Sequence, residues 1–216
     1  MTKLKICGLR REEDIEIVNK YRPTYVGFVF AKSKRQVSLR DAKALKAKLI
    51  DQIATVGVFV NEPIENIYLY AKEGVIDYIQ LHGDEDGQYI KRLKEQVKLP
   101  IIKAIRVSDK TQLIRQLEEM QSLPIDYYLF DTYTAQVYGG SGASFDWHFI
   151  KELVGKQIQK PYFLAGGIGS DNLEKALKEN PYAIDLSSKV ETDGFKDEAK
   201  IKEVCEILQS AQLQNY

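Results

Sequence analysis

The stretch YFLAGGIGSDNL, residues 162–173, contains the pattern that decides the fold. Its first four residues are apolar and suit a strand that is buried on both faces, as in a parallel sheet. Glycines at 166, 167 and 169 then mark a tight turn just before a predicted helix. A buried strand, a glycine turn and a helix form one β/α unit, so we expect a protein built from such units.

The same alternation of strand and helix signals extends outward along the whole chain. Short runs rich in Val, Ile, Tyr and Phe predict strands, and the amphipathic segments between them predict helices. The predicted strands are 4–7, 24–30, 54–60, 77–81, 101–107, 126–131, 162–167 and 183–187, and the predicted helices include 11–21, 39–50, 85–97 and 108–121.

Eight strand signals, each followed by a helix signal, predict an α/β protein with a closed (β/α)8 TIM barrel. An open, doubly wound sheet usually has fewer strands and one point where the strand order reverses. No linker-like segment divides the 216 residues, so we expect a single barrel domain over residues 1–216. At helix starts, Asp109, Ser170 and Asp171 are predicted to accept hydrogen bonds from free backbone N–H groups.

The charge balance argues against polyanionic partners. Lys plus Arg and Asp plus Glu each number 31, which makes the formal net charge zero. A neutral protein has no general attraction for nucleic acid or for an anionic membrane surface, so we expect neither as a partner.

The cysteines and the hydropathy pattern indicate a soluble, cytoplasmic protein. Cys7 and Cys205 lie far apart in a chain long enough to fold without a disulfide, so we expect free thiols in a reducing compartment. The N-terminal residues 1–8 are too few and too charged for a signal peptide, and no run of about 18 apolar residues occurs.

In a (β/α)8 barrel, the active site lies at the C-terminal ends of the strands. A polar residue or a glycine falls at each of the predicted ends. These residues are Cys7, Gly8, Ser33, Arg35, Asn61, Gln80, His82, Arg106, Asp131, Gly166, Gly167, Ser187 and Ser188.

The last two strand ends predict a phosphate site. Gly166 and Gly167 allow backbone N–H groups to approach an anion closely, and the positive end of a following helix would add to the attraction. Ser187 and Ser188 can add donors from the neighbouring loop. The alternative is a plain turn into a helix.

Cys7 is a candidate base or nucleophile. The basic residues Arg10 and Arg11 follow it, and cationic surroundings lower the pKa of a thiol. The resulting thiolate can remove a proton or attack a substrate. The alternative is a small buried apolar residue at the end of a strand.

Asp131 is a candidate general acid. It ends the apolar run 126–131, and we expect burial to raise its pKa so that it holds a proton near neutral pH. The alternative is a carboxylate that caps the next helix or loop. The glycine-rich segment after it is predicted to bind a ligand or act as a lid.

Arg35 and His82 have two interpretations each. The guanidinium of Arg35 can hold a carboxylate by two hydrogen bonds, but Arg35 also lies in a basic loop that would be solvated anyway. His82 can face the site or cap a loop, and His148 is expected on a helix surface.

Several motifs, taken together, resemble the phosphoribosylanthranilate isomerase family across nearly the whole chain. They are KICG at 5–8, SKR at 33–35, VGVFVN at 56–61, QLHGDE at 80–85, FDTYTAQVYGGSGASFDW at 130–147, LAGGI at 164–168 and IDLSSKVETDGFKD at 184–197.

The resemblance implies an Amadori rearrangement of N-(5-phosphoribosyl)anthranilate in tryptophan biosynthesis, without a metal or a cofactor. It implies that Cys7 is the general base, that Asp131 is the general acid and that Arg35 holds the anthranilate carboxylate. Gly166, Gly167, Ser187 and Ser188 would bind the phosphate of this phosphosugar substrate, and Gln80 and His82 are candidate substrate contacts. We expect a monomer or a homodimer.

Two positions depart from the family pattern. Lys34 stands where the family commonly has proline, which predicts a more mobile Arg35 loop. Lys189 stands where the family usually has glycine, and its ammonium can either meet the phosphate or turn outward. Competing interpretations are an indole-glycerol-phosphate synthase, a pentose-phosphate epimerase, or a non-catalytic sensor of a phosphorylated ligand.

Overall fold

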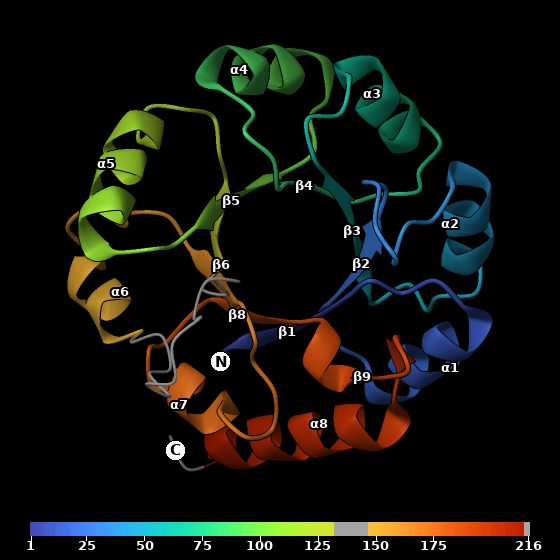
Figure 1. Ribbon diagram of the computed structural model, residues 1–216. Coiled ribbons are helices and arrows are strands. Elements are labelled where there is room, and N and C mark those ends of the chain that lie inside the picture. The colour runs from blue at the N-terminus through green and yellow to red at the C-terminus, as the bar shows by residue number, and fades with distance from the viewer. Residues whose placement is uncertain (132–146, 214–216) are drawn as a thin grey trace.

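The computed structural model describes residues 1–131 and 147–213 and confirms the predicted (β/α)8 TIM barrel. Figure 1 shows a ring of strands in the middle with the helices around its outside. The strands run parallel in chain order, and β8 pairs with β1 to close the barrel. The predicted lid segment after Asp131, residues 132–146, lies outside the described residues, and the single-domain assignment stays a prediction.

The helices and strands follow the predicted segments to within a few residues. The strands are β1 Lys3–Cys7, β2 Tyr25–Val29, β3 Ala54–Phe59, β4 Tyr78–Leu81, β5 Ile101–Arg106, β6 Tyr127–Asp131, β7 Tyr162–Ala165 and β8 Ala183–Leu186. The helices are α1 Glu12–Tyr21, α2 Leu39–Lys46, α3 Ile64–Lys72, α4 Gly87–Gln96, α5 Lys110–Met120, α6 His148–Leu153, α7 Leu173–Leu177 and α8 Glu198–Leu213.

A short insertion between β8 and α8 was not predicted. It consists of the 3₁₀ helix η1 Ser188–Val190 and an antiparallel pair of two-residue strands, β9 Glu191–Thr192 and β10 Phe195–Lys196. Such short strands lack the length that makes a strand signal visible in sequence.

The apolar residues form two cores, because alternate side chains of a strand point to opposite faces. Those that point outward pack against the helices in a large core. Those that point inward fill the barrel, and they are Tyr25, Val56, Ile102, Ala104, Leu129, Phe163, Ala165 and Ala183. The interior of the barrel is therefore packed, and the active site of such a barrel lies at the C-terminal ends of its strands.

The capping predictions are partly confirmed. The side chain of Asp109 accepts a hydrogen bond from the backbone N–H of Gln112 and caps α5. The predictions for Ser170 and Asp171 are wrong, because α7 begins later, after Asn172. The Asn172 amide instead bonds the backbone of the preceding loop, at the N–H of Gly169 and the carbonyl of Gly167.

Cys7 and Cys205 are both free thiols, and both are buried. Among the described helices, none combines the length and the apolar character needed to cross a bilayer.

Candidate active site

A cavity of about 540 Å³ lies at the C-terminal mouth of the barrel. It brings together every residue that the sequence analysis assigned to catalysis or substrate binding. These are Cys7, Arg35, Gln80, His82, Asp131, Gly166, Gly167, Ser187 and Ser188. Residues from six different strands or the loops that follow them therefore meet at one site, as expected of a barrel enzyme.

Cys7 lies at the end of β1 with 8% of its surface exposed. It packs against Gly27 of β2, where an added Cβ would lie 2.6 Å from its Sγ atom, so only glycine allows this contact. Burial raises the pKa of the Cys7 thiol above its ordinary value, although the ammonium of Lys5 opposes this effect.

The expectation that Arg10 and Arg11 lower the pKa of Cys7 is wrong. Arg10 donates to the carbonyl of Gly194 at 2.9 Å, and Arg11 bonds the carboxylate of Asp14 at the start of α1. Both guanidinium groups lie over the ring of Phe195 in β10, at 4.1 Å and 3.9 Å from its centroid. Arg10 and Arg11 belong to the loop after β1. Their side chains therefore need not point in the same direction as that of Cys7, the last residue of the strand.

Two cations that the sequence analysis missed, Lys5 and Lys196, act to lower the pKa of Cys7. Lys5 is fully buried in the barrel, and its Nζ atom donates to Oδ2 of Asp185 at 2.8 Å. Lys196 is also buried, and burial lowers its pKa although Glu191 opposes this effect. The sequence did contain a signal for the Lys5–Asp185 ion pair. Each of these charged residues interrupts a run predicted to be a buried strand, and a buried charge needs a partner of opposite charge.

Asp131 ends β6 and faces His82. Its Oδ2 atom lies 3.3 Å from Nε2 of His82, and a quarter of each side chain is exposed. The expected burial of Asp131 is therefore wrong, because the strand ends at the open mouth of the barrel.

His82 faces the cavity, which decides between its two interpretations. Its Nδ1 atom lies 2.9 Å from Nε2 of Gln80. An amide NH₂ group only donates, so Nδ1 accepts and the ring hydrogen sits on Nε2, where it points toward Asp131. Gln80 thus orients His82, and His82 contacts the candidate acid.

Arg35 binds a carboxylate by two hydrogen bonds, but the carboxylate belongs to this chain. Its Nε and Nη2 atoms donate to Oε1 and Oε2 of Glu191, each at 2.7 Å. Lys196 donates to the same Oε1 atom at 2.7 Å. Burial would raise the pKa of Glu191, but these two cations lower it. The sequence analysis did not identify Glu191, which lies in the unpredicted insertion.

The residues predicted to bind phosphate line one side of the cavity. Gly166 and Gly167 have φ angles of 94° and 66°, a left-handed conformation that favours glycine. The hydroxyl of Ser187 donates to the carbonyl of Cys7 at 3.4 Å. Because α7 begins well after Gly167, an anion here would meet the N–H groups of the loop rather than the helix end.

Lys189 turns outward rather than toward the glycines. Its Nζ atom forms an exposed ion pair with Oδ2 of Asp171 at 3.2 Å. Lys189 still lines the cavity, and a Cβ atom added at Gly169 would lie 2.9 Å from the Cβ atom of Lys189.

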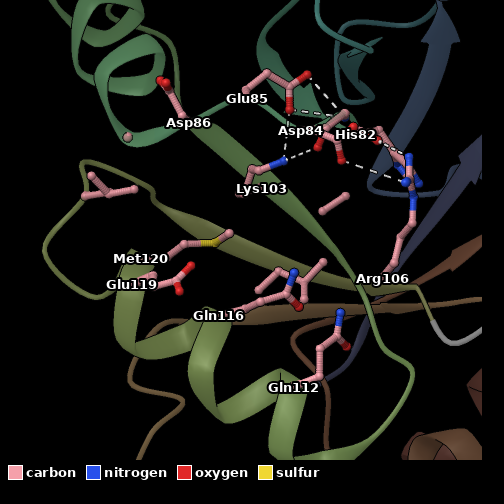
Figure 2. A pocket seen from close by; sticks show the side chains of 15 residues that line it. His82, Asp84, Glu85, Asp86, Lys103, Arg106, Gln112, Gln116, Glu119 and Met120 are labelled. Atoms are coloured by element: carbon pink, nitrogen blue, oxygen red, sulfur yellow. Dashed lines mark hydrogen bonds and ion pairs between the residues drawn. The ribbon is translucent and has the colours of Figure 1, made fainter.

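A second cavity, of about 470 Å³, lies outside the barrel between the loop after β4, β5 and α5. Figure 2 shows Lys103 pointing toward Glu85, and Arg106 reaching toward His82 and Asp84. Neither Cys7 nor Asp131 lines this cavity. The barrel mouth is therefore the candidate active site, and within residues 1–131 and 147–213 no cluster of His, Cys, Asp or Glu suits a metal ion.

The comparisons with known proteins point to one family. A family model described as N-(5'-phosphoribosyl)anthranilate (PRA) isomerase matches residues 4–207. The isomerase of that name from Clostridium acetobutylicum is 50% identical over 203 residues, which cover 94% of this chain and 95% of the relative.

Two solved structures agree with this match. The phosphoribosyl anthranilate isomerase from Thermotoga maritima is 34% identical, with a TM-score of 0.85 over 97% of this chain and 100% of that one. A second such isomerase was solved in complex with reduced 1-(o-carboxyphenylamino)-1-deoxyribulose 5-phosphate. It is 30% identical, with a TM-score of 0.81 over 97% and 100% of the two chains.

Proposed function

Because the chain belongs to the N-(5'-phosphoribosyl)anthranilate isomerase family, we propose that Cys7 and Asp131 are the general base and the general acid of its reaction. The chain is an aldose-ketose isomerase of tryptophan biosynthesis. It converts N-(5-phosphoribosyl)anthranilate to 1-(2-carboxyphenylamino)-1-deoxyribulose 5-phosphate. The family match decides against the synthase, epimerase and sensor interpretations.

The proposed mechanism has two proton transfers at the sugar. Asp131 protonates the ring oxygen, the furanose opens, and the nitrogen lone pair forms a Schiff base with C1. The Cys7 thiolate then removes the proton from C2, and the electron pair moves into an enolamine that tautomerises to the ketone. Such a sequence needs one protonated and one deprotonated group at the same sugar.

The positions of Cys7 and Asp131 support these roles. Cys7 ends β1 and Asp131 ends β6, on strands that are not neighbours in the ring, and both side chains line one cavity. A sugar bound at the mouth can therefore be approached from two directions. This shared cavity is the observation that carries the proposal.

The two anionic ends of the substrate need separate partners. We assign the phosphate to the loop N–H groups at Gly166 and Gly167 together with Ser187 and Ser188, since these groups donate hydrogen bonds and lie together. We assign the anthranilate carboxylate to Arg35, which already holds Glu191 in the required two-point geometry. When the substrate binds, its carboxylate either replaces the Glu191 carboxylate on Arg35 or shares the guanidinium with it.

An assay of substrate consumption tests the proposal. The purified protein is mixed with N-(5-phosphoribosyl)anthranilate, and the loss of its fluorescence is followed while the product is identified by mass and by its ketone. We expect turnover by the unmodified protein without added metal. Turnover that survives unchanged in both Cys7→Ser and Asp131→Asn would contradict the assigned roles. Cytoplasmic location, the absence of a nucleic-acid partner, and a monomeric or dimeric state stay predictions.

A further inference from the structure

Four tyrosines form one layer of side chains at the N-terminal mouth of the barrel, the end where the strands begin. They start or directly precede the even-numbered strands and are Tyr25, Tyr78, Tyr127 and Tyr182. Alternate strands of a (β/α)8 barrel contribute the side chains of each interior layer, so the fold brings these hydroxyl groups together. The ring centroids of Tyr25 and Tyr78 lie 5.2 Å apart, and those of Tyr127 and Tyr182 lie 5.1 Å apart.

The hydroxyl of Tyr182 is the centre of a hydrogen-bond network in this layer. Nζ of Lys3 donates to Oη of Tyr182 at 2.7 Å, and Oη of Tyr25 lies 2.9 Å from the same atom. Lys3 begins the neighbouring strand β1, and its backbone N–H also donates to the carbonyl of Tyr182 at 2.9 Å. The ammonium is therefore held beside the phenol from two points.

The network favours the phenolate form of Tyr182. A phenolate can only accept, and Tyr25 has a hydrogen to donate, so loss of the Tyr182 proton keeps both hydrogen bonds and adds attraction to the Lys3 ammonium. Burial raises the pKa of Tyr182, but Lys3, Tyr25 and Tyr127 outweigh burial and lower this pKa below its ordinary value. Burial raises the pKa of Tyr25 and of Tyr127, so Tyr182 loses its proton before either of them.

The side chain of Tyr182 can also be reached from outside. Tyr182 is partly exposed, whereas Tyr25 is only 2% exposed. The partly exposed rings of Tyr78 and Tyr127 belong to the same layer and offer an aromatic surface at the mouth. A reagent that carries an aromatic ring can pack against them while its reactive atom meets the Tyr182 oxygen.

We propose that Tyr182 is a nucleophilic modification site of this protein, which takes aryl sulfonyl and aryl acyl electrophiles at the N-terminal mouth of the barrel. With benzenesulfonyl fluoride, the phenolate oxygen attacks the sulfur atom, an S–O bond forms and the S–F bond breaks. Fluoride leaves with the bonding electron pair, and the phenol proton passes to solvent. The adjacent cation activates the phenol by favouring its deprotonated form. The site does not depend on the proposed function, since Cys7 and Asp131 lie at the other end of the strands.

Labelling of the unmodified protein with benzenesulfonyl fluoride near neutral pH tests the proposal, with the modified peptides identified by mass spectrometry. Tyr68 of α3 is an internal reference, because it is 45% exposed and solvent access alone would make it the faster of the two. We expect Tyr182 to be modified at least about 10-fold faster than Tyr68, the change in phenolate fraction that one unit of pKa produces.

Two variants test the network itself. Lys3→Met removes the ammonium and should slow the labelling of Tyr182 by about 10-fold or more, with the labelling of Tyr68 unchanged. Tyr25→Phe removes the second donor and should also slow the labelling of Tyr182. In the unmodified protein the labelling of Tyr182 should rise at a lower pH than that of Tyr68, and Lys3→Met should move this rise to higher pH.

Two lysine substitutions serve as controls. Lys3→Arg keeps a cation beside Tyr182 and should retain most of the labelling rate. Lys43→Met removes a lysine of α2 that pairs with Glu73 outside the barrel, and it should leave the labelling of Tyr182 unchanged.

Labelling of Tyr68 as fast as Tyr182 in the unmodified protein would overturn the modification site. So would an unchanged rate at Tyr182 in both Lys3→Met and Tyr25→Phe. The comparison of two tyrosines within one chain needs no variant, so it decides the matter even if a variant does not fold. None of these results depends on isomerase turnover, which tests the proposed function separately.

Discussion

Lys5 and Asp185 form a buried ion pair inside the barrel, with Nζ of Lys5 2.8 Å from Oδ2 of Asp185. The two residues are register partners on the neighbouring strands β1 and β8. Cys7 lies two residues beyond Lys5 on the same face of β1, so the pair forms the floor beneath the thiol. Burial raises the pKa of Asp185, and Lys5 opposes this effect. Since the pair is close to neutral, it offers the Cys7 thiolate less stabilisation than a lone cation would.

The first prediction concerns the proposed base. Cys7→Ser should lower kcat by roughly 100-fold or more, because an alcohol is a much poorer base than a thiolate, while binding of the reduced product analogue is kept. Cys205→Ser is the matched control, since Cys205 is a buried thiol in α8 far from the cavity. Near-normal turnover in Cys7→Ser would remove Cys7 from the mechanism.

The second prediction concerns pH. Because the pKa of Cys7 is raised above the ordinary 9.0, the thiolate fraction should still be rising at pH 9. Alkylation of Cys7 by iodoacetamide should therefore accelerate with pH and show a midpoint above 9. The measurement uses Cys205→Ser, because burial raises the pKa of Cys205 to about 11 and its reaction would overlap. A midpoint at or below 8 would show that cations dominate over burial.

The third prediction concerns the proposed acid and its neighbour. Asp131→Asn should lower kcat by about 100-fold or more, because an amide cannot protonate the ring oxygen. His82→Gln should have a smaller effect, since His82 contacts Asp131 without supplying the proton. If His82→Gln costs as much as Asp131→Asn, the histidine rather than the aspartate is the acid.

The fourth prediction concerns Arg35. Arg35→Leu should raise KM by about 10-fold or more with little change in kcat, because the lost interaction binds substrate and transition state alike. The same variant should lose little affinity for an analogue that carries aniline in place of anthranilate. An equal loss for both ligands would mean that Arg35 acts only through its ion pair with Glu191.

The fifth prediction concerns stability outside the active site. Lys103 and Glu85 form a buried pair at 2.9 Å, visible in Figure 2, with 3% and 1% of their side chains exposed. Lys103→Met leaves the Glu85 carboxylate buried without its cation. The free energy of unfolding, measured with urea, should therefore fall by about 3 kcal/mol. Arg115→Met is the control, because it breaks an exposed ion pair with Glu119. It should lower the free energy of unfolding by less than about 0.5 kcal/mol.

The amount that sequence alone could predict varies between parts of the molecule. The strands and helices could be predicted because hydrophobic periodicity is a local property of the sequence. Eight successive strand–helix units are compatible with few folds. The barrel then placed Cys7 and Asp131 at one mouth, because parallel strands all end on the same side. The short insertion around Glu191 left no such periodic signal.

The sequence by itself determined the barrel, the edge on which the site lies and the residues at the ends of its strands. Only the tertiary structure decided what surrounds those residues. Arg35 meets Glu191 across 156 positions of the chain, and Lys5 meets Asp185 across 180. The cations expected beside Cys7 instead face Phe195. Periodicity reports which face of an element is buried, whereas the partner of a buried charge depends on how distant strands and loops pack, and no local pattern encodes that.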